Sequence, residues 1–390
     1  MTLRFLTGGE SHGRGLLLLL EGLPSGLSLP PRAFENELCR RRRGFGRGPR
    51  MKLERDILSF WGGLRNGKTT GAPFGCVLEN TEWESWRPAM DPERTDPEAV
   101  EKVRPECPRP GHADLAGALK YGTGDVRNVL ERASARSTAA WTLAGTVAKL
   151  LLEELGIHVG GAVFSMGSAS IPLPSEEREW EEAFSSDMGC PSSGEEILRK
   201  PVEKASREGE TLGGSFCIRA TGMPPGIGSY AEWDRRLDGL CAGALMAIPG
   251  IKAVGVGDGE ELGKCPGSEA HDPISPLPGG GYRRERNRAG GIEGGVTNGE
   301  DLLFRATMKP IPTLKKPLGS VNLRTHQPQE AHVERGDVCA VPAACVVGEA
   351  MIAWVLARTV MEQFGGDRVE DLVRRFFEHR SRMERGLSGV

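Results

Sequence analysis

Residues Asp125 to Leu155 form the segment that most limits how this chain can fold. The residues of this segment predict one continuous helix. The helix is expected to end at Gly156, because glycine readily adopts the left-handed conformation that follows a helix. Small side chains occupy seven positions of the segment, namely Ala133, Ala135, Ala139, Ala140, Ala144, Gly145 and Ala148. Since small side chains let another backbone approach closely, we expect this helix to lie in the middle of the molecule.

A second helix is predicted from Pro342 to Phe364, with proline in its first turn and two glycines after its end. Short apolar runs next to glycine predict strands at 15–23, 71–80, 160–168, 213–222, 252–259 and 302–309. Because strands and helices interleave, the fold class is mixed α+β. A length of 390 residues is compatible with one large domain or with two.

Two short stretches resemble each other. GLPSGL occupies 22–27 and GMPPGI occupies 222–227, and each is followed by an aromatic residue with a leucine four positions further on. Both read as strand, tight turn and helix. Chance and internal duplication both explain the similarity, and a duplication predicts two similar halves packed together.

The overall composition argues against nucleic acid and membranes as partners. The net charge is −3 and the pI is near 6.2. The most apolar run, at 15–23, contains Glu21 and falls far short of the roughly 20 residues of a membrane span, so we interpret it as a buried strand and not a signal peptide. The nine cysteines form no C-x-x-C pair and are odd in number, which favours a reducing cytoplasm over disulfides or a zinc site.

Positive charge is concentrated in the run RRRRGFGRGPRMKLER, at residues 40–55. Eight Lys or Arg residues and one acid, Glu54, give this run a local charge of +7. Arginine binds carboxylate or phosphate through two hydrogen bonds at once, and neighbouring glycines let backbone amides approach an anion. A solvated basic surface or a nucleic-acid patch would also explain the run. Against a nucleic-acid patch, Phe45 is the only aromatic residue within residues 40–55, and the rest of the chain is not basic. We therefore favour a pocket for a small, multiply charged anion.

Two histidines share an unusual setting. His12 lies in GGESHGRG and His112 in RPGHAD, so each is flanked by glycine and has an arginine within three residues. A histidine near an anionic ligand can donate a proton at neutral pH, although a lone histidine is often structural. The other five histidines have no comparable setting, and no spacing points to a metal.

Polar residues recur in the segment ERASARSTA, at 131–139. Arg132 and Arg136 would lie one helical turn apart on a shared face, with Ser134 between them. A charged helix edge is the simplest interpretation. The surrounding alanines favour burial instead, and buried arginines need an anion.

Three further segments have the character of loops. MKPIPTL, at 308–314, presents Lys309 and Thr313 on a backbone stiffened by proline. Arg335 and Asp337 precede the second predicted helix, where an acid is most often a cap. The irregular stretch 263–291 is interpreted as a lid over a site, with disorder as the alternative.

No dinucleotide or P-loop motif appears in a suitable context, and the arginines, two histidines and one acid suit chemistry on a small polyanion, such as loss of phosphate. Together, these segments resemble the chorismate synthase family, in family order from residue 3 to beyond residue 350. The matching segments are LRFLTGGESHGRG, RRRRGFGRGPRMKLERD, GKTTGAPFG, RPGHADLAGALKYG, DVRNVLERASARSTAA, GGIEGGVTNGE, MKPIPTL and ERGDVCAVPAACVVGEAM.

The resemblance implies a fold and a reaction. It implies a single domain over 1–390, built as a β-α-β sandwich, and a cytoplasmic homotetramer. It implies conversion of 5-enolpyruvylshikimate 3-phosphate into chorismate and phosphate by anti-1,4-elimination, dependent on reduced FMN. The substrate carries two carboxylates and a phosphate, which agrees with the charge at 40–55.

The resemblance also assigns roles. His12 would protonate the leaving phosphate, His112 would face the flavin N1 and C2 carbonyl, and Asp337 would lie near flavin N5 and help to take the proton from carbon 6. Substrate binding is assigned to Ser11, Arg41, Arg47, Arg50, Ser134, Arg136 and Arg335. Flavin contacts are assigned to His112, Ser134, Ala135, Arg136, Pro249, Gly250, Gly294, Lys309, Pro310, Ile311, Pro312, Thr313, Arg335 and Asp337. No metal is implied.

Some positions depart from the family pattern. Ser137 and Trp141 replace Glu and Arg, Gly336 replaces Ser, Phe45 replaces Tyr and Pro49 replaces Gly. Glycine at 336 would give the following acid more freedom, and proline at 49 removes an amide donor.

Two other functions stay open. One is a flavin-dependent oxidoreductase acting on a small polyanion, although no added segment suggests a hydride-donor site. The other is a nucleic-acid-binding module using residues 40–55. Some members of the family reduce their own flavin with NADPH, and the sequence does not decide the source of reduced flavin.

Overall fold

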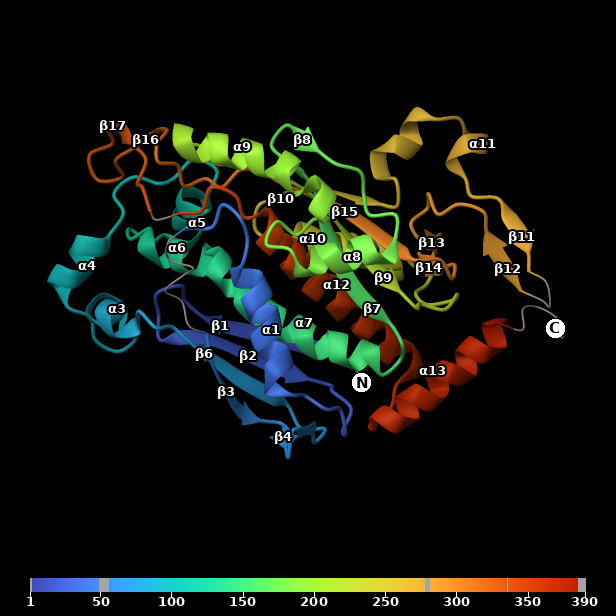
Figure 1. Cartoon of the computed structure of the whole chain (residues 1–390). Coiled ribbons are helices and arrows are strands. Elements are labelled where there is room, and N and C mark those ends of the chain that lie inside the picture. Colours follow the sequence, from blue (N-terminus) through green and yellow to red (C-terminus); the bar gives the residue numbers. More distant parts are fainter. Residues whose placement is uncertain (1, 49–55, 278–280, 335, 385–390) are drawn as a thin grey trace.

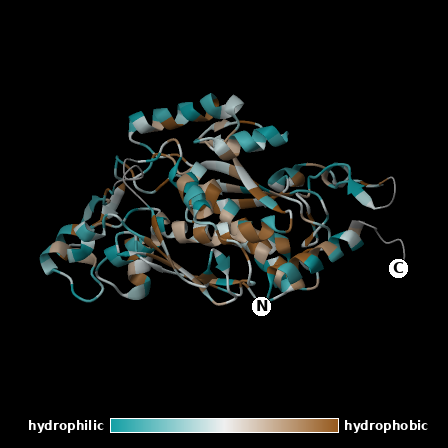
Figure 2. Cartoon of the chain, turned by 60° about the horizontal axis from the view of Figure 1, so that its bottom comes forward, coloured by the Kyte–Doolittle hydropathy of each residue, from teal (hydrophilic) through white to brown (hydrophobic). Residues whose placement is uncertain are grey.

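The computed structural model describes the chain except residues 1, 49–55, 278–280, 335 and 385–390. Two antiparallel sheets enclose a layer of helices, as expected for a β-α-β sandwich (Figure 1). Hydrophobic residues gather on the central helices and the strands beside them, and hydrophilic residues cover the peripheral helices (Figure 2). The main core therefore lies between the sheets, around α7 and α12.

The first half of the chain forms one sheet in the order β1-β2-β6-β3. Its main elements are β1 (Arg4–Gly9), β2 (Gly15–Glu21), α1 (Pro31–Arg42), β3 (Ile57–Gly62), β6 (Phe74–Glu79) and α7 (Thr138–Glu153). The second half contains β7 (His158–Met166), β9 (Gly214–Thr221), α10 (Leu237–Met246), β10 (Ile251–Val256), β15 (Leu302–Met308) and α12 (Val341–Phe364). Its strands follow the corresponding order, β7-β9-β15-β10, with β8 (Ala169–Ser170) added at the β7 edge.

Smaller elements connect these two sets. The helices are α3 (Trp83–Met90), α4 (Pro97–Val103), α5 (Asp114–Tyr121), α6 (Arg127–Ala133), α8 (Glu177–Ser185), α9 (Glu195–Glu208), α11 (Gly267–Ala270) and α13 (Val369–Glu384). Short 3-10 helices occur at Ala135–Ser137, Ser192–Gly194, Trp233–Arg235 and Gly259–Lys264. The hairpins are β4 (Leu64–Arg65) with β5 (Lys68–Thr69), β11 (Ile274–Pro276) with β12 (Tyr282–Arg284), β13 (Ile292–Glu293) with β14 (Val296–Thr297), and β16 (Gly319–Val321) with β17 (Pro328–Glu330).

The two similar turns noted in the sequence belong to a structural repeat. Thr69 Oγ1 donates to the carbonyl of Pro24, and Thr297 Oγ1 donates to the carbonyl of Pro224, both at 2.6 Å. Each threonine hydroxyl also accepts an amide hydrogen bond from its turn at 2.9 Å. The same turn chemistry therefore closes the same position of both halves, and the prediction of two similar halves packed together is confirmed.

All six predicted strands are present, as β2, β6, β7, β9, β10 and β15. The second helix is confirmed as α12. By length and composition α12 is apolar enough to cross a membrane, but 94% of its most apolar window is buried inside the structure. Its side chains therefore build the core between the sheets.

The prediction of one continuous helix over 125–155 is wrong. The helix is interrupted at Ser134, whose φ of −62° and ψ of 140° are extended, and whose hydroxyl accepts the Arg136 amide at 3.3 Å. Arg132 consequently bonds to Thr7, whereas Arg136 bonds elsewhere, so the two arginines do not share a face. Local hydrogen bonding by serine offers the backbone this alternative to a helix.

The segment 263–291 is not irregular throughout. It contains α11 and the β11–β12 hairpin, and Figure 1 draws these at the end of the molecule away from α5 and α6. The expectation of a long stretch without regular structure is therefore wrong.

The central position of α7 is confirmed by its contact with α12. A Cβ atom added to Gly145 would lie 2.2 Å from the Cβ of Ala350 and 2.4 Å from its Cα. Contacts this short cannot be relieved by moving a flexible side chain, so glycine is required where the helices cross.

Replacing Gly145 by alanine is expected to destabilise the protein by about 1–3 kcal/mol, because overpacking at the crossing outweighs the better helix propensity of alanine. The matched control is Gly243→Ala on α10, where an added Cβ meets nothing within 4 Å. The control is expected to stabilise by about 0.5–1 kcal/mol. Urea unfolding at equal protein concentrations measures both, and an equally stable Gly145→Ala variant would contradict the close crossing.

Candidate active site

A cavity of about 450 Å³ opens where equivalent ends of the two repeats meet. The first repeat contributes residues from the end of α1 and just after it, and residues from before α7 to its first position. The second repeat contributes residues that follow α10 and β15 and residues at the start of α12. The cavity is lined by Arg41, Arg47, Gly48, Arg109, 111–113, Leu130, 133–136, Thr138, 248–250, Lys252, 308–313, Gly336, Asp337, Ala340, Ala343, Ala344 and Val347.

Two arginines from the basic run reach this cavity. Arg41 donates to Thr138 Oγ1 at 3.1 Å and to the Ala135 carbonyl at 2.9 Å. Arg47 forms an ion pair with Asp337 at 2.8 Å. The start of α7 and the approach to α12 therefore hold these two cations at the cavity wall.

Other charges of the basic run serve the fold. Arg40 pairs with Glu349 at 2.7 Å and with Glu37 at 2.9 Å, and Arg42 pairs with Asp56 at 3.2 Å. The interpretation of the whole run as an anion pocket is therefore too broad. Arg50 lies outside the described residues.

Asp337 is held from two sides. The backbone amide of Gly48 donates to its Oδ1 at 2.6 Å, while Arg47 pairs with Oδ2. These contacts fix the carboxylate although glycine precedes it at 336, the position where the sequence suggested added freedom. A negative group is thereby placed among the cations Arg41, Arg47 and Arg136 of the cavity lining.

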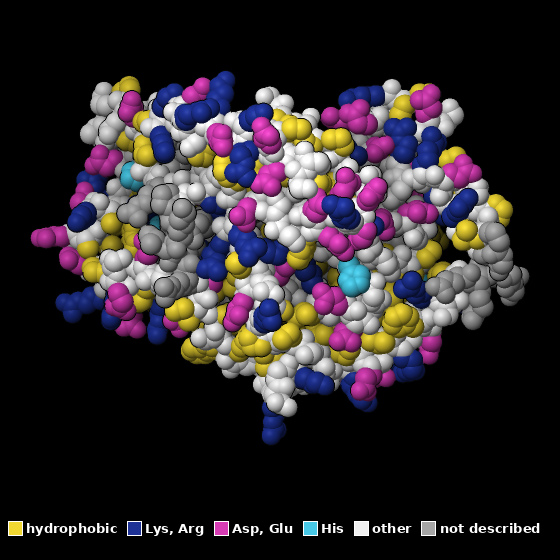
Figure 3. All heavy atoms as spheres, in the orientation of Figure 1, with side chains coloured by type: hydrophobic (Ala, Val, Ile, Leu, Met, Phe, Trp, Pro, Cys, Tyr) yellow, Lys and Arg dark blue, Asp and Glu magenta, His cyan; other side chains and the backbone are white. Residues whose placement is uncertain are grey.

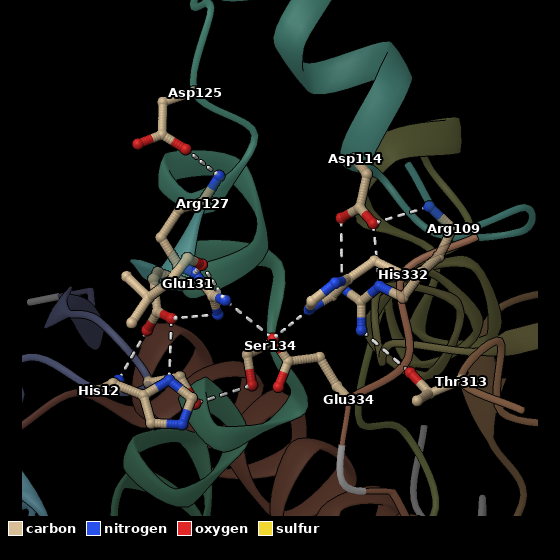
Figure 4. A network of polar contacts seen from close by, with 12 residues as sticks. His12, Arg109, Asp114, Asp125, Arg127, Glu131, Ser134, Thr313, His332 and Glu334 are labelled. Carbon is tan, nitrogen blue, oxygen red and sulfur yellow. Dashed lines mark hydrogen bonds and ion pairs between the residues drawn. The ribbon is translucent and has the colours of Figure 1, made fainter. Parts of the chain in front are cut away.

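His112 lies in a dense polar cluster at the start of α5. Its Nδ1 contacts Asp114 Oδ1 at 2.5 Å. Arg109 donates to Asp114 Oδ2 at 2.9 Å and to Thr313 Oγ1 at 3.0 Å (Figure 4). Burial alone would raise the pKa of Asp114, but the hydrogen bonds from His112 and Arg109 outweigh it, so this pKa is held well below its usual range. Arg109 thus links His112 to the 308–313 loop.

Arg136 is buried at the cavity wall and is already paired. Its Nη1 contacts Asp56 Oδ1 at 2.8 Å, and its Nε donates to Asn80 Oδ1 at 3.2 Å. Ser134, which begins the break before α7, contacts Ser11 through their hydroxyls at 3.1 Å. The N-terminal loop is thereby joined to the cavity.

His12 lies beside the cavity and is not one of its lining residues. Glu131 contacts its Nδ1 at 2.8 Å, and the indole of Trp86 stacks on its ring with centroids 4.0 Å apart. His12 is therefore positioned next to Ser11 and Ser134 by residues from α6 and α3.

The second repeat gives the cavity a largely neutral wall. Pro249 and Gly250 follow α10, and the loop from Lys309 to Thr313 follows β15. Lys309 donates to the Gly111 carbonyl, and burial together with the nearby Lys252 lowers the pKa of Lys309. The loop of this wall therefore meets the first repeat beside His112, through Lys309 with Gly111 and Thr313 with Arg109.

The structure brings most of the predicted residues together. The cavity contains Arg41, Arg47, His112, Ser134, Ala135, Arg136, Pro249, Gly250, Lys309, Pro310, Ile311, Pro312, Thr313 and Asp337, and Ser11 and His12 adjoin it. Gly294 lies in the turn between β13 and β14 and does not line the cavity. Among the described residues of 263–291, none lines it either, and Arg335 lies outside the described residues.

Sequence reasoning missed several supporting residues. Lys252, Asp56, Trp86 and Glu131 were not singled out. Lys252 is the first residue of the predicted strand 252–259, so its position at the end of a predicted element was a signal in the sequence. The other three contact site residues that are far away in the sequence, so no local pattern indicated them.

Comparison with known proteins places this geometry in a family. The sequence model of the chorismate synthase family matches residues 3–361. The chorismate synthase of Moorella thermoacetica is 48% identical over 98% of this chain and 99% of its own length, and that of Symbiobacterium thermophilum is 48% identical over 96% and 97%. A crystal structure of a chorismate synthase superposes with a TM-score of 0.79 at 36% identity, covering 98% of this chain and 99% of that chain.

The chain belongs to the chorismate synthase family. The β-α-β sandwich expected from the sequence is confirmed by this likeness and by the topology. Family membership makes the chain a carbon–oxygen lyase that forms chorismate, the last step of the shikimate pathway. In this chorismate synthase, the cavity between the repeats is the candidate active site.

The variant Asp114→Asn is expected to destabilise the protein by about 3 kcal/mol at pH 7, because Arg109 and His112 lose a buried partner. The folded-state pKa of Asp114 is depressed, so its contribution is present above the unfolded pKa, near 3.9, and is lost as pH falls. The stability difference between wild type and variant should therefore shrink below about pH 4. Urea unfolding between pH 3 and pH 7 measures it, and a difference independent of pH would contradict this assignment.

Proposed function

We propose that this chorismate synthase eliminates phosphate from 5-enolpyruvylshikimate 3-phosphate in the cavity between the repeats, with reduced FMN bound in the same cavity. The supporting observation is the meeting of a cationic wall from the first repeat with a largely neutral wall from the second in about 450 Å³. The cationic wall would bind the anionic groups of the substrate, and the largely neutral wall would contact the flat ring of the flavin.

The residues present fit a flavin. Proline and alanine side chains offer an apolar surface, and the same cavity is lined by Lys309 and His112. When bound, reduced FMN supplies electron density that helps to expel phosphate. Cationic groups at the edge would stabilise the negative charge of the reduced ring, which is an electrostatic role of the kind assigned to His112.

Arginine side chains carry the proposed substrate binding. Arg41, Arg47 and Arg136 can orient carboxylate and phosphate through planar pairs of hydrogen bonds. In this proposal Ser11 and Ser134 contribute hydroxyl donors nearby. Arg50 and Arg335 keep the same roles by resemblance.

Two groups carry the proposed proton transfers. His12 protonates the departing phosphate, and Asp337 accepts the proton that leaves carbon 6. Arg47 and the Gly48 amide both hold the Asp337 carboxylate in place, and a carboxylate is the group that can accept a proton.

The remaining expectations complete the proposal. A homotetramer, a cytoplasmic location and the contact of Gly294 with flavin are proposed from the family resemblance. The two alternatives differ in cofactor or partner. A flavin-dependent oxidoreductase would require NADPH during turnover, and a nucleic-acid module would require a broad basic surface. On the face drawn in Figure 3, basic and acidic side chains are interspersed.

Purified protein is expected to release phosphate from 5-enolpyruvylshikimate 3-phosphate under anaerobic conditions when reduced FMN is supplied chemically. No NADPH should be needed, because the reaction has no net redox change. The measurement is phosphate release together with chorismate absorbance, with oxidised FMN as control. If NADPH remained essential with reduced FMN present, the oxidoreductase alternative would gain support.

The variants His112→Ala and Asp337→Ala are each expected to slow turnover at least tenfold and to stay folded, on the scale of electrostatic or general acid–base losses. The matched control is His158→Ala, at an exposed histidine that begins β7. Steady-state phosphate release and circular dichroism measure activity and folding. Wild-type turnover in either variant would refute the role given to that residue.

A further inference from the structure

One carboxylate holds His12 at two points. Glu131 Oε2 accepts the backbone amide of His12 at 2.6 Å, and Glu131 Oε1 contacts the ring Nδ1 at 2.8 Å (Figure 4). Both groups are buried, with 1% of Glu131 and 8% of His12 exposed. The two residues are 119 positions apart, so this contact is produced by the fold and not by the local chain.

The contact fixes the chemical state of the ring. An ionised carboxylate can only accept hydrogen bonds, so Nδ1 of His12 must carry a proton. Nε2 is then the nitrogen that gains and gives the second proton. The stacked indole of Trp86, inclined by 28° to the imidazole, fixes the plane of the ring.

A second cation keeps Glu131 ionised. Arg127 Nη1 lies 3.3 Å from Glu131 Oε1, and Arg127 itself is anchored by Glu334 at 2.9 Å and by the Val103 carbonyl at 3.0 Å. Burial alone would raise the pKa of Glu131, but the hydrogen bonds and charge of His12, together with Arg127, lower it overall. His332 contacts Glu334, the carboxylate that pairs with Arg127.

We propose that Glu131 is a positioning residue for His12. The Glu131 carboxylate holds the proton on Nδ1 of His12 and stabilises the imidazolium, so that Nε2 of His12 can protonate the departing phosphate. This inference rests on the proposed role of His12 as the acid. A purely structural role would make Glu131 an anchor for the backbone of the N-terminal loop alone. The two roles differ in whether the protonation of His12 depends on the charge of Glu131.

The variant Glu131→Gln separates them. Its carbonyl can still accept the His12 amide, but its NH₂ group then faces Nδ1, which forces the proton to Nε2 and removes the attraction for the imidazolium. Because His12 acts as a proton donor, its active form is the imidazolium. In the variant the imidazolium is therefore lost at a lower pH than in the wild type. We expect kcat to fall at least tenfold at pH 7.5, with KM changed by less than about threefold. The alkaline limb of the pH–rate profile should move down by about one pH unit or more.

Two further variants control for folding and for charge. Asp125→Asn removes a carboxylate that accepts the Arg127 amide at 2.9 Å before the same helix, without touching His12, and should keep the wild-type profile. Glu131→Asp keeps the negative charge and should recover part of the shift. Recovery by Asp, with all variants folded by circular dichroism, supports positioning through charge.

The protonation of His12 can also be followed without substrate or flavin. In protein labelled at histidine Cε1, the signal lost in His12→Asn identifies His12, and its titration midpoint should fall by about one pH unit or more in Glu131→Gln. An unchanged midpoint and an unchanged pH–rate profile would overturn the inference. Wild-type phosphate release by His12→Asn would instead overturn the proposed role of His12, whereas a slow His12→Asn with a fast Glu131→Gln would overturn positioning alone.

Discussion

The crossing of α7 and α12 at Gly145 and Ala350 is the contact on which the rest of the structure depends. Both helices begin at the cavity, α7 just after the break at Ser134 and α12 just after Asp337. Close packing along their length therefore sets the distance between the two walls of the active site. Since packed interiors transmit small displacements, a shift at the crossing would be felt where the helices begin.

A buried ionic cluster completes this central layer. Lys149 on α7 contacts Glu37 on α1 at 2.7 Å and Glu349 on α12 at 2.6 Å, and Arg40 contacts both carboxylates. Burial alone would raise the pKa of Glu37, but Lys149 and Arg40 together lower it to about 2. With two cations and two anions the cluster is neutral, which limits its desolvation cost. It also turns Arg40 inward while the next residue, Arg41, faces the cavity.

The repeat explains how one site obtains two kinds of wall. The end of α1 leads to Arg41 and Arg47, whereas the corresponding end of α10 leads to Pro249 and Gly250. Both halves keep the same strand order and the same threonine-closed turn, so the architecture is shared. The walls differ because the equivalent ends of the two halves present different residues, arginines in the first half and proline and glycine in the second.

These features also show what the sequence could predict. The turns at 22–27 and 222–227 were visible because glycine and proline are required by their backbone geometry. The six predicted strands were visible because each is a short apolar run next to glycine. Strand β1 was not visible, because its sequence RFLTGG contains no such apolar run. The break at Ser134 was missed because small residues continue on both sides of it, and only hydrogen bonds to the serine hydroxyl reveal the interruption. Glu131 was missed as a partner of His12 because the contact exists only after the two segments fold together.

The two histidines of the site have a similar arrangement of neighbours. Asp114 contacts both His112 and Arg109, and Glu131 contacts both His12 and Arg127, although Arg109 also lies 3.1 Å from His112 Nδ1. In each case the arginine and the histidine together lower the pKa of the carboxylate, so the carboxylate keeps a cationic partner even when the imidazole is neutral. A carboxylate paired with histidine alone would lose that support at the moment of proton transfer. In the proposed reaction, Arg127 therefore lets the His12 ring keep one orientation before and after its proton leaves.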